Sequence, residues 1–435
     1  MDNLKTKSKE DWTFLEFSTK NYSHGFHLYP ARMHPEIAKR LIEKYAQDPK
    51  KTIFDPFMGS GGVLVESLLH GNNSVGIDVN PFAVLISRVK TLTIETTRLE
   101  KQFNQIMAKV EADYTRNVKY DTSPKSSNLN LQFWYSPEVI KSLEILKHHI
   151  FNLEDSKSII DFFKICFSLT SRKASYQRNS IYKIYRMSEK QMKSFKPNVF
   201  RIFQDICKVN IQKMSEMNIS SKKAKAFPIL GDSRNVLSEF SKVPKEIFDD
   251  GKVHLVVTSP PYGDHQTTVA YGQFSKHPGL WLDLPQEKLL DVDSIGLGGT
   301  RKKDFSDLGS PLLNRILNQV EKNDIELSKN KNPNRAKDVF SFFYDLDKCL
   351  EQITLVLKPN DSHCCFVVAN RTVRRIKIPT DQIIVELGKK YGLKYEDTKY
   401  RTIANKAMAV KNAPENITDF TGETMTRESI VIWKY

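Results

Sequence analysis

Short apolar runs that lead into an acidic or turn-forming residue recur along the chain and alternate with segments of helical periodicity. A helical pattern over residues 34–47 precedes the first run, and Pro81 opens a later helix at a position where proline is favoured. The alternation predicts an α/β fold, with a mostly parallel sheet and helices on its faces. The runs occupy residues 52–57, 74–80, 227–235, 253–261 and 362–370.

Two segments interrupt this alternation. Residues 91–225 carry mainly helical patterns, so we expect them to be inserted between sheet-forming parts at 24–90 and 226–435. Residues 285–336 are polar and rich in glycine, asparagine and lysine, which predicts a long loop excursion. The chain then closes with a helix near residues 382–390 and a strand near 393–403.

The positive charge of the chain is concentrated in the inserted region. The net charge is +15, and residues 171–225 contain 14 lysines and arginines against three acids. Such a block suits a polyanionic partner, because phosphate contacts and counterion release supply affinity that does not depend on sequence. A solvated helical surface would have the same composition, so other motifs must decide between the two interpretations.

Several classes of protein are disfavoured by the sequence. No apolar run approaches the roughly 18 to 20 residues of a membrane span. The first residues lack the apolar stretch of a signal peptide, so we expect a cytoplasmic protein. Five cysteines without CxxC spacing argue against a disulfide framework or a metal site and favour buried thiols.

A glycine-rich turn follows the first apolar run. Asp55 ends that run, and Gly59, Gly61 and Gly62 precede a helix. Ligands of open parallel sheets bind beyond the carboxyl ends of the strands, where glycine lets them approach the backbone. The lysine of a P-loop and the GxGxxG spacing of a dinucleotide site are both absent. A purely structural turn is the alternative.

Two further acids stand at strand ends. Asp78 follows Asp55 by 23 residues and closes the second run, where a carboxylate can accept hydrogen bonds from ribose hydroxyls. Asn80, directly before Pro81, is the better helix N-cap, which leaves Asp78 for a ligand. Asp232 closes the third run. Three such acids predict a nucleoside-bearing ligand across one edge of the sheet.

The motifs DPFMGSGG, GIDVNP, GDS and TSPPYG occur in this order and resemble S-adenosylmethionine-dependent DNA methyltransferases that modify exocyclic amino groups. SPPY resembles the cytosine-N4 branch, whereas adenine-N6 enzymes more often begin this motif with Asp or Asn. Residues 24–42 resemble the cofactor-contacting helix of these enzymes. The resemblance implies a Rossmann-like class I methyltransferase fold with a seven-stranded sheet. It also implies a prokaryotic, nucleoid-associated protein with S-adenosyl-L-methionine as cofactor.

The resemblance assigns cofactor contacts to ten residues. The methionine end would be lined by the Gly-rich turn, the ribose held at the second strand and the adenine bordered at the third. The carboxylate end would meet the segment before the first helix. The residues at the methionine end are Asp55, Phe57, Gly59 and Gly61, and the ribose contact is Asp78. The residues beside the adenine are Asp232 and Ser233, and those near the carboxylate end are Tyr29, Ala31 and Met33.

The SPPY segment is suited to the methylation of an amine. A base amine is a poor nucleophile because its lone pair is conjugated with the ring, and two acceptors on its N–H groups would free that pair. Ser259 Oγ and the carbonyl of Pro260 offer these acceptors, and Pro260 and Pro261 supply no competing N–H. Tyr262 is expected to stack on a flipped base. Tyr271 could form a wall of the same pocket or begin a helix.

The inserted region is the expected target-recognition region for double-stranded DNA. Residues 171–186 interleave basic and aromatic side chains, which suit contacts to phosphates and base edges. The candidates are Arg172, Tyr176, Arg178, Lys183 and Arg186.

The sequence therefore predicts a site-specific DNA methyltransferase acting on the N4 amine of cytosine. By resemblance it would belong to a restriction–modification system, with a cognate restriction endonuclease as a possible partner. Adenine-N6 methylation, RNA base-amine methylation and a catalytically silent nucleic-acid-binding protein on the same fold are the alternatives. The intact Asp55, Asp78 and SPPY segment argue against silence.

Overall fold

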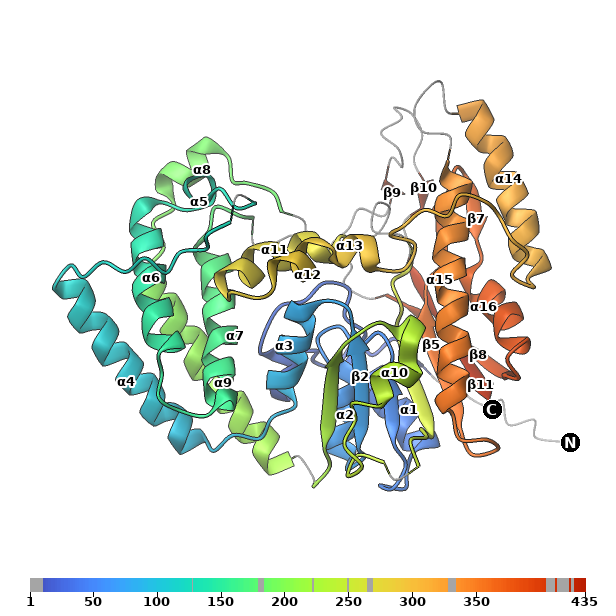
Figure 1. The fold of residues 1–435 in the computed structure, drawn as a ribbon, viewed down its shortest axis with the longest axis horizontal. Helices are drawn as coiled ribbons and strands as arrows, with labels where there is room; N and C mark the ends of the chain where they lie inside the picture. The colour runs from blue at the N-terminus through green and yellow to red at the C-terminus, as the bar shows by residue number, and fades with distance from the viewer. Residues whose placement is uncertain are drawn as a thin grey trace, which may run out of the picture.

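A seven-stranded sheet forms the centre of the protein (Figure 1). The strand order is β3-β2-β1-β4-β5-β11-β8. β11 (Arg427–Lys434) pairs antiparallel with both of its neighbours, whereas the pairs among the other strands are parallel. The α/β class and the mostly parallel seven-stranded sheet are thus confirmed. This computed structural model describes residues 11–126, 128–178, 184–220, 223–248, 250–263, 269–327, 334–403, 411–412, 422–423 and 426–435.

The strand order reverses between the first and fourth strands, which lie side by side. At such a switch point the connections leave in opposite directions, and a crevice opens beyond the carboxyl ends of the strands. The acids predicted at strand ends therefore meet at one edge. The remaining strands are β1 (Ile53–Asp55), β2 (Ser74–Asp78), β3 (Ala226–Leu230), β4 (Leu255–Thr258), β5 (His363–Val368) and β8 (Lys394–Thr402).

Successive side chains of the strands enter different hydrophobic cores on the two faces of the sheet. Ile53 and Val257 belong to a core with α1 and α2, whereas Phe54 and Val256 belong to a core with α15 and α16. This alternation is the two-residue period of a strand, and it produces three layers. The helices are α1 (Pro35–Tyr45), α2 (Gly62–His70), α10 (Val236–Phe240), α15 (Arg335–Val356) and α16 (Thr380–Lys389).

Local signals place the helix that follows β2. Asn80 caps α3 (Pro81–Lys90) by accepting a hydrogen bond from Phe82 N at 3.0 Å, and Pro81 occupies its first turn. The predicted N-cap is confirmed, and Asp78 is left at the strand end. The cap fixes the direction in which α3 leaves the crevice.

The inserted region is mainly helical and lies to one side of the sheet in Figure 1. Its apolar side chains form one core that continues into α3 and into α11 (Tyr271–Trp281). The insertion is therefore packed against the sheet domain next to the crevice. Its helices are α4 (Thr96–Thr115), α5 (Leu131–Trp134), α6 (Pro137–Phe151), α7 (Lys157–Ala174), α8 (Glu189–Ser194) and α9 (Val199–Ser220).

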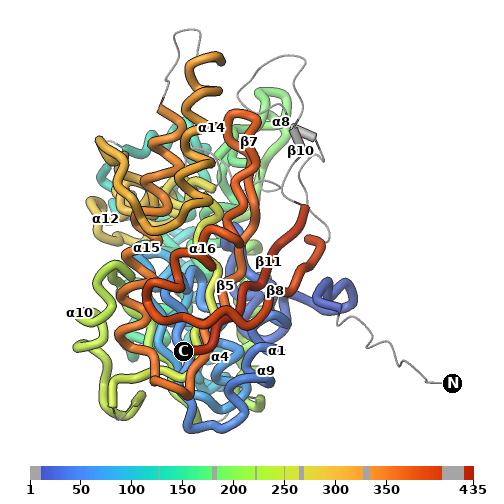
Figure 2. Tube along the Cα trace, turned by 90° about the vertical axis from the view of Figure 1, so that its right-hand side faces the viewer, coloured from blue at the N-terminus to red at the C-terminus, as the bar shows by residue number. Residues whose placement is uncertain are grey.

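The expectation of a long loop at residues 285–336 is wrong. The segment contains α12 (Gln286–Leu290), α13 (Val292–Ile295) and α14 (Pro311–Leu327), and α14 lies beside α15 (Figure 2). Polar residues dominate the composition, yet the apolar ones are spaced by three and four residues and form one buried stripe. The stripe consists of Leu313, Ile316, Leu317 and Val320.

Two further observations concern the cysteines and the apolar character of the helices. All five cysteines are buried, as the absence of CxxC spacing predicts. No helix in the described part of the chain combines the length and the apolar character needed to cross a membrane.

A pair of substitutions on α15 tests the layered core. Leu350 is 0 % exposed in the core beneath the sheet, whereas Leu355 on the same helix is 44 % exposed. We expect Leu350→Ala to lower the free energy of unfolding by about 2–5 kcal/mol, because it leaves a cavity. Leu355→Ala should change it by about 0.5 kcal/mol or less. Urea denaturation measures both, and equal effects would contradict the assignment of the buried face.

Candidate active site

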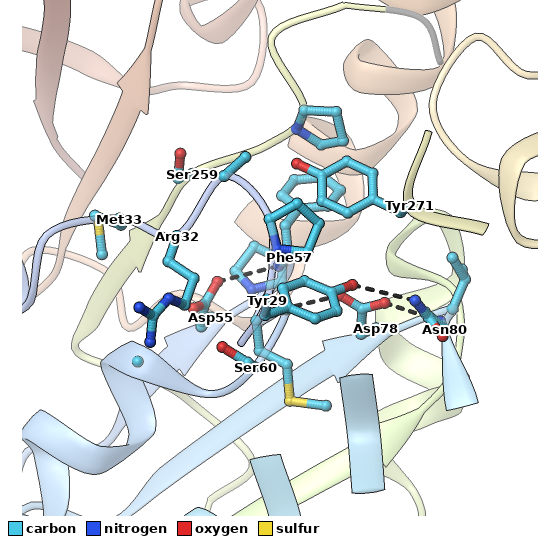
Figure 3. A pocket seen from close by; sticks show the side chains of 18 of the residues that line it. Tyr29, Arg32, Met33, Asp55, Phe57, Ser60, Asp78, Asn80, Ser259 and Tyr271 are labelled. Atoms are coloured by element: carbon cyan, nitrogen blue, oxygen red, sulfur yellow. Dashed lines mark hydrogen bonds between the residues drawn. The ribbon is translucent and has the colours of Figure 1, made fainter. Parts of the chain in front are cut away.

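A cavity of about 280 Å³ opens at the carboxyl edge of the sheet (Figure 3). The loops after β1, β2, β3 and β4 line it, together with residues 29–35 before α1 and the segment around α13. Most of the residues singled out in the sequence meet here. They are Tyr29, Ala31, Met33, Asp55, Phe57, Gly59, Asp78, Asp232, Ser233, Ser259 and Pro261.

Asp55 links two strands on the floor of this cavity. Its Oδ1 accepts hydrogen bonds from Thr258 Oγ1 at 2.6 Å and from Phe57 N at 3.1 Å. Its Oδ2 has no hydrogen-bond partner among the described residues. Burial raises the pKa of Asp55 to about 7. A ligand group that donates a hydrogen bond or carries positive charge would favour the ionised form.

Asp78 occupies the neighbouring strand end, and in Figure 3 Asp55 and Asp78 lie on either side of the Tyr29 ring. Asp78 accepts hydrogen bonds from Gly59 N at 2.9 Å and from Asn80 N at 2.8 Å. Burial raises its pKa to about 6. Gly59 has a φ of 49°, in the left-handed region that glycine adopts readily. The turn thus brings backbone N–H groups to the carboxylate.

Tyr29 forms one wall of the cavity. Its hydroxyl accepts a hydrogen bond from Asn80 Nδ2 at 3.1 Å, and the same amide donates to Ser275 Oγ at 2.7 Å. The Tyr29 ring stacks on Tyr271 with centroids 5.9 Å apart. Tyr271 therefore both begins α11 and lines the cavity, so the two interpretations of this residue hold together.

The Asp232 side chain is fixed by a residue that the sequence analysis missed. Arg234 donates to both oxygens of Asp232, with Nε–Oδ1 at 3.0 Å and Nη2–Oδ2 at 2.7 Å. The guanidinium also lies 3.3 Å from Asp345 of α15. Two carboxylates raise the pKa of Arg234 above its ordinary value, although burial opposes this. The GDSR sequence could have indicated this pair, because an arginine two residues after a strand-end acid can fold back on it.

The SPPY segment lies at the rim of the cavity. Ser259 and Pro261 line it, whereas Pro260 is buried behind them and Tyr262 is not part of the lining. Ser259 Oγ donates to the Tyr262 hydroxyl at 3.3 Å, and that hydroxyl donates to Glu428 Oε1 at 2.7 Å. Burial, followed by the Glu428 carboxylate, raises the pKa of Tyr262 well above its usual range. Tyr262 is thus anchored through its hydroxyl.

Glu428 belongs to β11 and forms a buried ion pair with Arg401 of β8, with Nη1–Oε2 at 2.7 Å. Arg401 also donates to the carbonyl of Trp12 at 3.0 Å. Both strands lie late in the chain, and nothing in the local sequence connects them with the SPPY segment. The link depends on the antiparallel placement of β11 next to β5.

Some predicted residues do not lie in the cavity. Gly61 is the N-cap of α2, with a φ of 77°, and a Cβ there would lie 2.3 Å from Ser87 Oγ. Its role in this structure is to allow close packing of α2 on α3.

The basic and aromatic candidates of the inserted region separate into two groups. Arg172 is buried, donates to Gln177 at 3.0 Å and lies over the Phe274 ring, which does not favour a contact with DNA. Arg178 is exposed, whereas Arg186 stacks on Phe133 with 4.1 Å to the ring centroid and Tyr176 is half-buried. Lys183 lies outside the described residues.

The cavity also contains residues that the predicted set of cofactor contacts did not include. Lys90 and Arg32 supply positive charge, and Val292, Asp293, Ile295 and Leu297 come from the segment misread as a loop. Asp293 accepts a hydrogen bond from Gly272 N at 2.9 Å, which joins α13 to α11. Only the fold brings these segments to the crevice.

The strand order, the antiparallel β11 and the acids at the ends of β1, β2 and β3 define a Rossmann-like methyltransferase. The DNA methylase family of N6/N4 methyltransferases matches residues 1–88. Type II methyltransferase M.MvaI from Kocuria varians is 38 % identical over 97 % of this chain and 93 % of its own. Type II methyltransferase M.MjaII from Methanocaldococcus jannaschii is 23 % identical over 76 % of this chain and 77 % of its own.

The chain belongs to this family, the amino-group DNA methyltransferases of the N6/N4 type. Membership implies S-adenosylmethionine as methyl donor and DNA as substrate, and it confirms the resemblance seen in the motifs. Among solved structures, the rRNA methyltransferase aviRa from Streptomyces viridochromogenes covers 94 % of this chain and 88 % of its own, with a TM-score of 0.30 and 9 % identity. That likeness is too weak to support a conclusion.

The raised pKa of Asp55 predicts a pH-dependent stability. The pKa is about 7 in the folded protein, against about 3.9 in an unfolded chain. The stability due to this shift is therefore present below about pH 4 and lost as the pH rises through about 7. Asp55→Asn removes that loss, so at about pH 8 the ligand-free variant should be more stable than the wild type, by on the order of a few kcal/mol.

Denaturant unfolding at about pH 5 and about pH 8 measures the difference, which should narrow at the lower pH. Asp121→Asn is the control, because that carboxylate is 79 % exposed and its replacement should have no such pH dependence. A variant that is less stable than the wild type at both values would contradict the buried, protonated Asp55.

Proposed function

We propose that the protein transfers a methyl group from S-adenosylmethionine to the N4 amine of cytosine in duplex DNA. The observation that supports this most directly is the position of Ser259 and Pro261 at the rim of a cavity with Asp55 on its floor. The Thr258–Asp55 hydrogen bond joins the two parts. Ser259, at the first position of SPPY, is the residue that favours cytosine over adenine.

The residues of the cavity suit the cofactor. Asp78 would hold the ribose hydroxyls, and the turn at Gly59 would let the ligand approach the backbone. A Cβ at Gly62 would meet no atom within 4 Å, so the cavity is open above the start of α2. Asp232, held by Arg234, would border the adenine. When bound, the cofactor supplies an electrophilic sulfonium methyl group.

The SPPY segment would prepare the base amine. The Ser259 hydroxyl donates a hydrogen bond to the Tyr262 hydroxyl, so the lone pairs of Ser259 Oγ can accept from one N–H of the amine. The carbonyl of Pro260 would accept the other. The Tyr262 hydroxyl is itself held by its hydrogen bond to Glu428, and it therefore orients the Ser259 hydroxyl. Alignment of amine and methyl group is the main contribution, and such proximity can be worth roughly 7–11 kcal/mol.

The target base must leave the duplex to reach this cavity, at a cost of a few kcal/mol. Stacking on an aromatic side chain can return about 1–3 kcal/mol. Tyr271 lines the cavity, and Tyr262 directly follows the lining residue Pro261 in the chain, so these two rings are the candidate platforms.

The inserted region would hold the DNA. Its exposed cations would contact phosphates. Within the predicted recognition segment, the exposed Arg178 and the half-buried Arg186 are the candidates. A restriction endonuclease that cleaves the same site would be the functional partner. The exposed cations of this region include Lys173, Arg178, Lys190, Lys193, Lys196, Arg201 and Lys208.

Product analysis tests the base. The purified protein is incubated with duplex DNA and S-adenosylmethionine labelled in the methyl group, and the DNA is digested to nucleosides. We expect the label in N4-methylcytosine. Label in N6-methyladenine would contradict the cytosine assignment, and label in RNA but not in DNA would contradict the DNA substrate.

Substitution of Ser259 tests the role of the acceptor. Ser259→Ala should lower kcat by roughly 10²- to 10³-fold, the magnitude of removing one hydrogen bond made in the transition state. Binding of S-adenosylmethionine, measured by calorimetry, should be nearly unchanged. Ser241→Ala, an exposed serine outside the cavity, serves as control and should retain full activity. Equal loss of cofactor binding and turnover would refute the role of Ser259.

A further inference from the structure

Lys90 is a buried cation inside the cofactor cavity. It is the last residue of α3, it is 1 % exposed, and it lines the cavity. Its Nζ donates to Ser60 Oγ at 3.2 Å. Among the described residues, no carboxylate forms an ion pair with it. The ammonium group of Lys90 has therefore lost its hydrating water, and the hydrogen bond to the Ser60 hydroxyl compensates for only part of that loss.

The charges around Lys90 make its burial more costly. Arg32 and Lys213 are the charged neighbours that act on it, and both are cations. Burial, reinforced by these two charges, holds the pKa of Lys90 well below its usual range. The nearby Glu66 is engaged with His24 at 2.7 Å. If the position served only packing, a hydrophobic side chain of similar length could be buried at a lower free-energy cost.

The start of α2 adds a second feature that favours an anion. Gly61 is its N-cap and supplies no side chain to satisfy the first N–H groups of the helix. Such groups carry partial positive charge and bind anions readily. Gly62 lines the cavity, and a Cβ there would meet nothing within 4 Å. The free helix end therefore opens into space that a ligand can occupy.

Arg32 is a second cation that lines the cavity and acts on Lys90. It lies in the segment before α1 and donates from Nη1 to the carbonyl of His24 at 2.8 Å. Figure 3 shows its guanidinium on the side of the cavity where Asp55 and Ser60 lie. Lys90 is thus joined through Ser60 to the start of α2, and Arg32 is close enough to act on its charge. All of them line the cavity that also contains Asp55.

We propose that Lys90 is the counter-ion for the α-carboxylate of the cofactor's methionine end, with Arg32 and the N–H groups of α2 as further donors. The inference rests on the proposed use of S-adenosylmethionine. Asp55, whose Oδ2 is unoccupied among the described residues, would receive the α-ammonium group. An acid and a base of the same cavity would then bind the two charged groups of the zwitterionic amino acid.

This arrangement makes the carboxylate a requirement for tight binding. A cofactor that lacks it would leave Lys90 buried without a counter-ion, whereas the complete cofactor would neutralise it. Removal of the charge from the protein should therefore weaken only those ligands that carry the carboxylate.

The test compares two ligands with three proteins. Calorimetry measures the Kd of S-adenosylmethionine and of decarboxylated S-adenosylmethionine for the wild type, Lys90→Met and Arg88→Met. The wild type should prefer the complete cofactor by about 10- to 100-fold. Lys90→Met should lose most of this preference through weaker binding of the complete cofactor. Arg88→Met is the matched control, because Arg88 lies on the same helix and its side chain is 44 % exposed.

Thermal unfolding of the ligand-free proteins separates this role from a structural one. Lys90→Met should unfold at the same or a higher temperature than the wild type, because it removes a buried charge that forms no ion pair with the described residues. Lys90→Gln is a second variant with the same expected loss of preference. Equal weakening of both ligands, or of neither, would overturn the assignment. A wild type that binds neither ligand would instead contradict the proposed function.

Discussion

The hydrogen bond between Thr258 and Asp55 is the constraint on which the rest of the site depends. It joins the ends of β1 and β4, where the strand order reverses, and it is buried at 2.6 Å. On one side of it stands the Gly-rich turn, and on the other stands Ser259. A buried polar pair of this kind has few alternative partners, so it fixes the distance between the two halves. In the proposed reaction, that distance aligns the methyl group with the amine.

The site contains ionisable side chains that are buried, and burial disfavours their charged forms. Asp55 and Asp78 have raised pKa values because they are buried, and Lys90 has a lowered pKa for the same reason. Each group reduces the stability of the ligand-free protein at neutral pH. Cores that serve packing alone avoid such groups, whereas binding sites retain them and compensate elsewhere. The well-packed cores on both faces of the sheet provide that compensation.

The sequence predicts one half of the site better than the other. Asp55, Asp78 and Asp232 could be found because acids at the carboxyl ends of parallel strands must meet at one edge. Amino-acid composition alone was a poor guide to the structure of one segment and to the burial of one basic residue. The polar segment at residues 285–336 hides the apolar stripe of α14, and a basic block does not reveal which of its members, such as Arg172, is buried.

The sequence by itself determined the strand and helix alternation, the Gly-rich turn and the SPPY segment, because these depend on local periodicity and turn chemistry. Only the tertiary structure decided that Glu428 holds the Tyr262 hydroxyl, 166 residues away. Likewise, Lys90 reads in the sequence as the ordinary basic end of a helix, and the packing of α3 against α2 turns it inward. Contacts between distant segments depend on how the layers assemble, and no local pattern encodes that arrangement.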